Sequence, residues 1–210
     1  MATLKIVALA LAFCSAIAFV PTNVQRSASR VAPAMAEASP SVPFLNAPKY
    51  YPSGMVGDVG FDPLGLAENF DIKFLREAEI KHGRVAMLAC VGYIFPELFF
   101  HIPGDAYTAN NPLVAASQVG PQPLLQIVIF GGFVEAGLYN GQMSALTMFE
   151  GDMAKRKPGD FAFDPLKLMA EGDPNQYELK EITHGRLAMI AIGGMIHQSF
   201  LTGAGLFGHV

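Results

Sequence analysis

One sequence block occurs twice in this chain, at a constant offset of 102 residues. The motif Phe-Asp-Pro-Leu at 61–64 recurs at 163–166, and Glu-Ile-x-His-Gly-Arg at 79–84 recurs at 181–186. The small residues that follow the second motif recur in the same register, without any insertion. Such a duplication constrains the fold strongly, because both copies are expected to form the same local structure.

Each copy predicts a turn, a polar linker and a long helix. The Asp-Pro pair in each first motif disfavours helix and favours a turn. We therefore predict helices over about 71–100 and 174–201, with a bend in the first helix at Pro96. The Pro, Gly and Asn residues at 103–123 predict a linker, and a further apolar helix is expected over about 122–140.

Composition narrows the class of protein. The chain has 210 residues, is 51% hydrophobic and 15% charged, and carries a net charge of −4. The apolar content excludes disorder, and a nucleic-acid partner is not expected because no basic face is available. Two cysteines are too few for a disulfide framework or a thiolate metal cluster. A compact soluble core and a small membrane protein both remain.

The membrane class is the better of the two interpretations. None of the three predicted helices holds eighteen consecutive uncharged apolar residues, so a soluble three-helix bundle is the alternative. The stretches 85–95 and 187–196 lack a polar face, however, and a surface bundle helix needs one. Residues 73–100 would also span roughly 42 Å as a helix, enough to cross a bilayer at a tilt. We predict an all-α membrane protein with three transmembrane helices.

The distribution of Lys and Arg predicts the topology. The connection 101–122 and the segment after Arg186 contain neither, whereas the segment 140–180 and the start of the first helix contain several. The positive-inside rule places the mature N-terminus and the 140–180 connection on one side of the membrane. The first and third helices then run parallel. We expect them to cross and to be related by pseudo-two-fold symmetry along the membrane normal.

The first 36 residues have the composition of targeting segments. Residues 1–18 combine one lysine, a short apolar core and a small-x-small end, which predicts a signal peptide rather than a first membrane helix. Residues 19–36 contain two arginines, several Ser and Ala, and no acid, which predicts a transit peptide. This two-part leader, with Phe19 at its junction, resembles that of plastid proteins in algae with secondary plastids. Residues 37–210 would form the mature domain.

Ionisable residues stand where each repeat helix enters its apolar stretch. They are Glu79, His82 and Arg84 in the first copy, and Glu181, His184 and Arg186 in the second. Charges within a membrane cost ~2.5–3.5 kcal/mol or more each unless they are paired. Glu and Arg of one helix are five residues apart, about 140° around the axis, which is a poor geometry for pairing. Parallel helices instead favour the reciprocal pairs Glu79–Arg186 and Glu181–Arg84.

A stripe of small residues beside these groups allows close approach. Its members are Gly83, Ala86, Ala89 and Gly92, with their copies Gly185, Ala188, Ala191 and Gly194. Either a neighbouring backbone or a flat ligand can pack against such a stripe. One explanation is therefore purely structural: ion pairs and tight helix packing.

The two histidines admit a second explanation. A neutral imidazole nitrogen can bind a metal, but a catalytic zinc needs three or more converging protein ligands. Two histidines on separate helices are too few for that. A metal already held in a planar macrocycle needs one axial ligand per centre, so macrocycle binding and a structural role both fit the residues.

The repeated Glu-x-x-His-Gly-Arg-x-Ala-Met, each preceded by Phe-Asp-Pro-Leu, resembles the light-harvesting chlorophyll-binding family over about residues 55–200. His-Gly-Arg in both helices, with the two-part leader, is most similar to the fucoxanthin chlorophyll a/c-binding proteins of diatoms and related algae. Land-plant members usually carry Asn in place of His184 and Trp in place of Val85, and this chain has no Trp.

The resemblance implies chlorophyll a, chlorophyll c and fucoxanthin or a related carotenoid as cofactors. It implies that chlorophyll magnesium is bound by Glu79, His82, Glu181 and His184, with Arg84 and Arg186 pairing across to the carboxylates. It also implies ligands at Gln126, Glu135 and Gln198, and gives weaker candidates at His197, His101 and His209. The two Asp-Pro loops would border the grooves where carotenoids lie in the family.

The function implied by the resemblance is light harvesting in the plastid thylakoid membrane. The mature N-terminus would be stromal, and the partners would be other antenna subunits, a photosystem core and thylakoid lipids. Pigments held at fixed positions would transfer excitation energy, so no enzymatic activity is expected. Two alternatives stay open: a photoprotective, energy-dissipating member of the same family, or a small membrane transporter. Ionisable residues near one helix end, with no Gly/Pro-broken helix pair, count against the transporter.

Overall fold

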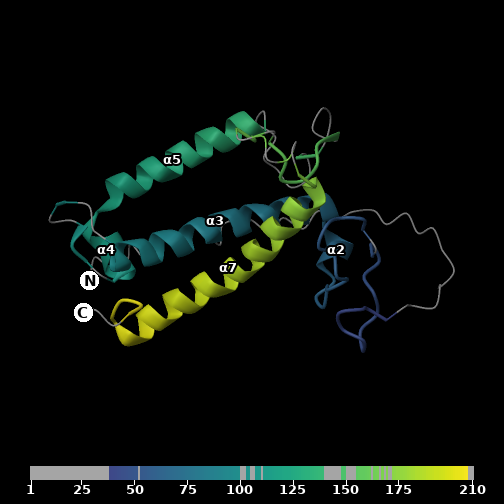
Figure 1. Cartoon of the computed structure of the whole chain (residues 1–210), viewed down its shortest axis with the longest axis horizontal. Helices are drawn as coiled ribbons and strands as arrows, with labels where there is room; N and C mark the ends of the chain where they lie inside the picture. The colour runs from purple at the N-terminus through teal and green to yellow at the C-terminus, as the bar shows by residue number, and fades with distance from the viewer. Residues whose placement is uncertain are drawn as a thin grey trace. The chain divides into compact units, whose positions relative to one another are not determined.

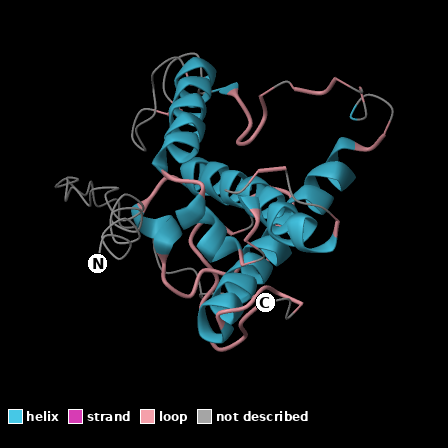
Figure 2. Cartoon of the chain, turned by 90° about the vertical axis from the view of Figure 1, so that its left-hand side faces the viewer, coloured by secondary structure: helices cyan, strands magenta, loops and turns pink. Residues whose placement is uncertain are grey.

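A computed structural model describes residues 38–51, 53–99, 103–104, 107–109, 111–139, 148–149, 155–161, 163–165, 167, 169 and 172–207. The targeting segments expected at 1–18 and 19–36, and the weaker candidates His101 and His209, lie outside this described part. Figure 2 shows it as helices and loops. The described residues form no β-strand; the single β-bridge among them joins Ala38 and Asn46. The described residues are thus mostly helical, as the all-α class requires.

The described residues form five helices, labelled in Figure 1. They are α2 (Leu66–Asn69), α3 (Ile72–Leu98), α4 (Pro112–Gln118), α5 (Pro121–Leu138) and α7 (Pro174–Thr202). The three long ones, α3, α5 and α7, occupy the segments for which the sequence predicts helices. Pro96 lies in the last turn of α3, two residues before the helix ends.

Short polar side chains begin three of these helices. Asp71 accepts a hydrogen bond from the backbone N–H of Lys73 at the start of α3, and Asn111 and Asp173 cap α4 and α7 in the same way. Each cap satisfies an N–H group that has no partner inside the helix. At the other end of α7, Gly203 has a φ of 68°, a left-handed conformation that favours glycine.

Helix α4 corrects the interpretation of residues 103–123 as a linker. Asn111 caps this helix, and Pro112 occupies its first turn, where the missing N–H of proline costs nothing. The residues at 113–117 are Leu-Val-Ala-Ala-Ser, which can continue the helix. The turn-forming residues around this segment therefore mark the boundaries of a short helix within the connection.

Among the described residues, no single helix has both the length and the apolar composition of a membrane span. The pair α4 and α5 passes by length and composition when taken together, with a bend of 99° between the two helices. Gly120, with a φ of 82°, lies at this break.

Helices α3 and α7 lie side by side and run in the same direction (Figure 1). Glu79 contacts Arg186 near the start of both helices, and the Tyr93 hydroxyl donates to the Met195 carbonyl at 3.2 Å further along. Residue numbers therefore rise together along the pair. The parallel direction predicted from the positive charges is confirmed.

The two helices approach each other closely at Gly83 and Gly185. A Cβ atom built on either glycine would lie 3.0 Å from the Cα atom of the other. A Cβ contact of this length is tighter than nine in ten real ones, so a side chain here would require the facing backbone to shift by a few tenths of an ångström. Ala86 and Ala188, one turn further along, are buried.

Small residues beyond the crossing behave differently. Gly92 and Gly194 are exposed, and a Cβ atom built on either would meet nothing within 4 Å. The stripe of small residues predicted from the sequence thus serves helix contact in its first half. In its second half it leaves open space beside the helices.

Helix α5 runs antiparallel to α3. Glu135 contacts Lys81, and Tyr139, which follows α5, contacts Glu77. Residue numbers therefore rise on one helix as they fall on the other. No residue of α5 is buried, and the Phe133 side chain is 78% exposed. Polar contacts near its C-terminal end thus connect α5 to α3.

We expect Gly83→Ala and Gly185→Ala each to lower the free energy of unfolding by about 1–3 kcal/mol, the usual cost of overpacking. The added methyl group would push the two backbones apart at their crossing. The measurement is thermal loss of helical circular dichroism in detergent.

Gly92→Ala is the matched control for the crossing. It is expected to be neutral or to stabilise by up to about 1 kcal/mol, because alanine favours helix over glycine. Equal effects at positions 83 and 92 would contradict the assignment of the crossing.

Candidate functional site

The two repeat copies bring their carboxylates and guanidinium groups together across the helix pair. Arg84 Nε donates to Glu181 Oε1 at 2.6 Å, and Arg186 Nε donates to Glu79 Oε1 at 2.7 Å. The four side chains are between 29% and 37% exposed, so the pairs are half-buried. Both reciprocal pairs that the repeat predicts are therefore present.

Each arginine also reaches the loop that precedes the opposite helix. Arg84 Nη2 donates to the Gly159 carbonyl at 2.9 Å, and Arg186 Nη1 donates to the Gly57 carbonyl at 3.0 Å. The two glycines have φ values of 79° and 74°, where glycine is favoured. Sequence analysis missed these contacts, although the dipeptide Gly-Asp at 57–58 recurs at 159–160.

The aspartates of the two Asp-Pro turns cap the backbone that follows them. Asp62 accepts from the N–H groups of Leu66 and Ala67, both at 2.9 Å. Asp164 accepts from the N–H of Met169 at 3.0 Å, and Ala67 and Met169 are repeat copies of each other. In the described residues, these aspartates shape the turns.

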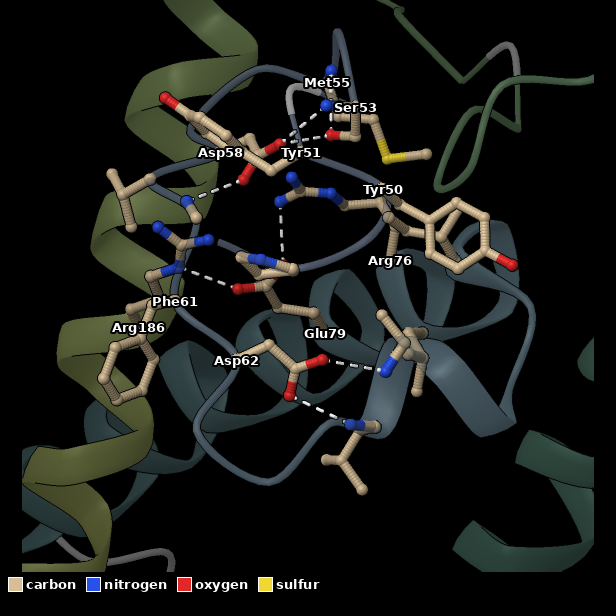
Figure 3. A pocket seen from close by; sticks show the side chains of 17 residues that line it. Tyr50, Tyr51, Ser53, Met55, Asp58, Phe61, Asp62, Arg76, Glu79 and Arg186 are labelled. Carbon is tan, nitrogen blue, oxygen red and sulfur yellow. Dashed lines mark hydrogen bonds and ion pairs between the residues drawn. The ribbon is translucent and has the colours of Figure 1, made fainter. Parts of the chain in front are cut away.

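A pocket of about 550 Å³ lies beside the Glu79–Arg186 pair (Figure 3). Asp58 orders its loop wall by accepting from the N–H and hydroxyl of Ser53 and from the N–H of Gly60. Burial alone would raise the pKa of Asp58, but these hydrogen bonds and the positive charge of Arg76 together hold the pKa below its ordinary value of 3.8. Apolar and aromatic lining residues include Tyr50, Tyr51, Met55, Phe61 and Leu75.

His82 and His184 have the same local contact. Nδ1 of each ring lies 2.7 Å from the carbonyl oxygen four residues earlier, that of Ala78 and of Lys180 respectively. A carbonyl can only accept, so Nδ1 carries the proton and Nε2 of the neutral ring keeps its lone pair. Both residues are exposed, which leaves Nε2 able to bind a metal from outside the helix pair.

The remaining sequence-based ligand candidates lie on α5 and α7. Gln126 is exposed on α5, and Glu135 on the same helix pairs with Lys81. Gln198 and His197 are exposed on α7, and the Gln198 amide nitrogen donates to a backbone carbonyl at 3.4 Å. No three His, Cys, Asp or Glu side chains within the described residues form a group that could hold a metal ion.

Glu77 is a buried carboxylate that sequence analysis missed. Its side chain is 1% exposed, and it accepts hydrogen bonds from the Tyr139 hydroxyl and the Gly159 N–H. Arg156 Nη2 lies 3.4 Å from it, and the guanidinium stands over the rings of Tyr139 and Phe161. This cluster ties the end of α5 and the loop before α7 to α3. The carboxylate has no copy in the repeat, which is why the repeat gave no signal for it.

The donor set fits a metal that needs one protein ligand per centre. A macrocycle would supply the remaining donors of such a metal, which agrees with single ligands on separate helices. A carboxylate bound to a guanidinium keeps lone pairs for a metal, and Glu181 Oε2 has no hydrogen-bond partner in the described part of the chain. The chemistry of these residues would therefore suit a metal that takes a single protein ligand better than a metal cluster.

The comparisons with known proteins agree on one family. The profile of the chlorophyll A-B binding protein family matches residues 47–200. A fucoxanthin-chlorophyll a-c binding protein of Isochrysis galbana is 38% identical over 189 residues, covering 80% of this chain and 88% of the relative. A fucoxanthin-chlorophyll a-c binding protein F of Phaeodactylum tricornutum is 35% identical, covering 66% and 73%. A light-harvesting complex stress-related protein 1 of Chlamydomonas reinhardtii is 33% identical, covering 71% and 64%.

The Arg84–Glu181 pair should show energetic coupling in a double-mutant cycle of Arg84→Met and Glu181→Gln. Either change alone leaves a half-buried polar group without its partner, and the double change removes both. We expect a coupling of about 1–3 kcal/mol in the free energy of unfolding.

The bridge between Lys157 and Glu178 is the control for this cycle. Its atoms are 3.6 Å apart and the lysine side chain is 71% exposed, so its coupling should stay below about 1 kcal/mol. Similar coupling energies in the two cycles would show that the Arg84–Glu181 pair stabilises the protein no more than an exposed ion pair does.

Proposed function

The chain belongs to the chlorophyll A-B binding protein family, and from this premise we propose that it is a light-harvesting antenna protein. It binds chlorophyll a, chlorophyll c and a fucoxanthin-type carotenoid, and it passes excitation energy toward a photosystem. The names of the similar proteins from Isochrysis galbana and Phaeodactylum tricornutum support these pigments.

One observation carries the proposal: the same ligand-bearing geometry is built twice across α3 and α7. Each copy has a carboxylate held by an arginine of the other helix. Each also has, three residues later, an imidazole whose Nδ1 is tied to its own helix. The two groups differ chemically, but both can offer an electron pair to magnesium from a fixed position.

Charge balance explains why arginine accompanies each glutamate. A carboxylate bound to the magnesium of a neutral complex would leave a negative charge in an apolar setting, which is costly. The arginine of the other helix neutralises that charge, and at Glu181 it still leaves the second oxygen for the metal. Histidine needs no such partner because its neutral ring is itself the ligand.

The exposed apolar surface supports membrane insertion and pigment contact. Leu88, Ile190 and Phe133, one on each long helix, are between 74% and 78% exposed. As part of this proposal, α3, α5 and α7 span the thylakoid membrane, with α3 and α7 related by pseudo-two-fold symmetry along its normal. The 27 residues of α3 would extend about 40 Å, enough to cross a bilayer at a tilt.

The chain's residues fix distances and orientations. The ion pairs and the Gly83–Gly185 contact hold α3 against α7, so ligands on these two helices keep constant separations. Absorption of light and transfer of its energy are supplied by the pigments when bound. The protein supplies ligation, burial and local charge, and it catalyses no reaction in this proposal.

Location and partners follow from the same family. The relatives are described as chloroplastic, which supports a plastid thylakoid location. We propose a two-part leader at 1–36, a stromal N-terminus of the mature domain at 37–210, and association with other antenna subunits and a photosystem core. The Lys and Arg distribution supports this orientation.

Reconstitution of the chain with chlorophyll a, chlorophyll c and fucoxanthin tests the function. We expect a stable pigmented complex in which light absorbed by the carotenoid or by chlorophyll c produces chlorophyll a fluorescence. The same pigments in detergent without protein are the control. A colourless folded protein would overturn the antenna assignment. A pigmented complex whose chlorophyll a fluorescence lifetime is strongly shortened would instead favour the photoprotective alternative.

His82→Leu is expected to remove about one chlorophyll per chain from the reconstituted complex, because leucine cannot bind magnesium. His82→Asn should retain that pigment, since an amide oxygen can act as the axial ligand. Pigment extraction and quantification measure both. Full pigment content in the leucine variant would contradict the role of His82.

A further inference from the structure

A third pair of a carboxylate and a cation joins two helices, and it stands outside the repeat. Lys81 Nζ on α3 lies 2.5 Å from Glu135 Oε2 on α5. The position in α7 that corresponds to Lys81 is Thr183, whose hydroxyl instead donates to its own helix backbone. The second repeat copy therefore has no cation at this position, and the contact between Lys81 and α5 is not part of the duplicated arrangement.

The environment of Lys81 restricts its ammonium group. Nζ lies 4.2 Å from the centroid of the Tyr139 ring, within the range of a cation–π interaction. Tyr139 is fully buried, and its hydroxyl is held by the buried Glu77. The Lys81 side chain is 26% exposed, whereas that of Glu135 is 42% exposed. A fixed cation thus faces a more accessible carboxylate.

Glu135 resembles Glu181 in how its two oxygens are used. In each residue one oxygen accepts from a cation on another helix. The second oxygen, Oε1 of Glu135 and Oε2 of Glu181, has no hydrogen-bond partner among the described residues. Glu135 therefore has the same combination of neutralised charge and available lone pair, built from a lysine instead of an arginine.

We propose that Lys81 is the positioning residue for a chlorophyll held by Glu135. This assignment rests on the proposed antenna function. Lys81 neutralises the Glu135 carboxylate and sets its direction, so that the second oxygen ligates magnesium on the exposed side of α5. The lysine itself does not touch the metal.

The competing explanation is that Lys81 and Glu135 form a surface salt bridge that only joins the helices. Removing the charge of Glu135 distinguishes this explanation from the positioning role of Lys81. A bridge that only joins helices is lost whenever either residue is changed. A charge-compensating lysine, by contrast, becomes unnecessary once residue 135 is a neutral ligand. Glutamine provides such a ligand, because its amide oxygen can bind magnesium without a counter-ion.

The test uses the full chain reconstituted with chlorophyll a, chlorophyll c and fucoxanthin, with chlorophyll counted per chain. Lys81→Met should lose about one chlorophyll, while Lys81→Arg should keep the wild-type number. The double variant Lys81→Met with Glu135→Gln should regain the lost chlorophyll, although it too lacks the ion pair. In pigment-free protein, the α5 amides of the Lys81→Met variant should exchange hydrogen faster than those of the wild type. The double variant should show the same increase, because it too lacks the ion pair.

Lys157→Met is the matched control, because it removes another lysine–glutamate bridge that touches no proposed ligand. It should keep the full pigment number. Full pigment in Lys81→Met, or equal loss in the single and double variants, would overturn the role of Lys81. A wild-type chain that binds no pigment would overturn the proposed function itself, so the two failures are distinguishable.

Discussion

The reciprocal carboxylate–guanidinium pairs between α3 and α7 determine how the rest of the described structure is arranged. A half-buried charge is tolerated when it is matched, and each arginine here is matched twice, by a carboxylate and by a loop carbonyl. The two helices must come close for these side chains to reach across. Gly83 and Gly185, each directly before one of the arginines, provide the space. The ion pairs, the helix crossing and the positions of the two loops therefore depend on one another.

This connection explains which parts of the fold could be predicted. A duplicated motif with Glu and Arg on different faces of one helix has few ways to neutralise its charges, so the reciprocal pairing followed from the sequence. Glu77 did not, because its counterpart in the repeat is Leu179 and its own segment looks like an ordinary polar helix surface. Helix α4 was missed because the Pro and Asn residues at its boundary also suit a loop.

The candidate ligands were harder to predict than the helix pair. His82 and His184 could be derived as surplus to packing, and their Nδ1 contacts agree with an outward-facing Nε2. Gln126 and Gln198 came from the family resemblance alone. A residue that binds a pigment from the exposed side of a helix makes few contacts with the rest of the protein. Neither periodicity nor packing therefore distinguishes it from a lipid-facing residue.

The departures from the repeat give the two glutamates of the duplicated motif different electrostatic surroundings. Arg76 Nη1 donates to Glu79 Oε2 at 2.7 Å, so Glu79 faces two guanidinium groups. The repeat copy of Arg76 is Glu178, and among the described residues the cation that faces Glu181 is Arg84. A carboxylate beside two cations donates less electron density to a metal than one beside a single cation. The duplicated motif therefore gives each glutamate an arginine partner on the other helix, while a difference outside the motif, Arg76 against Glu178, makes the electrostatic surroundings of the two carboxylates unequal.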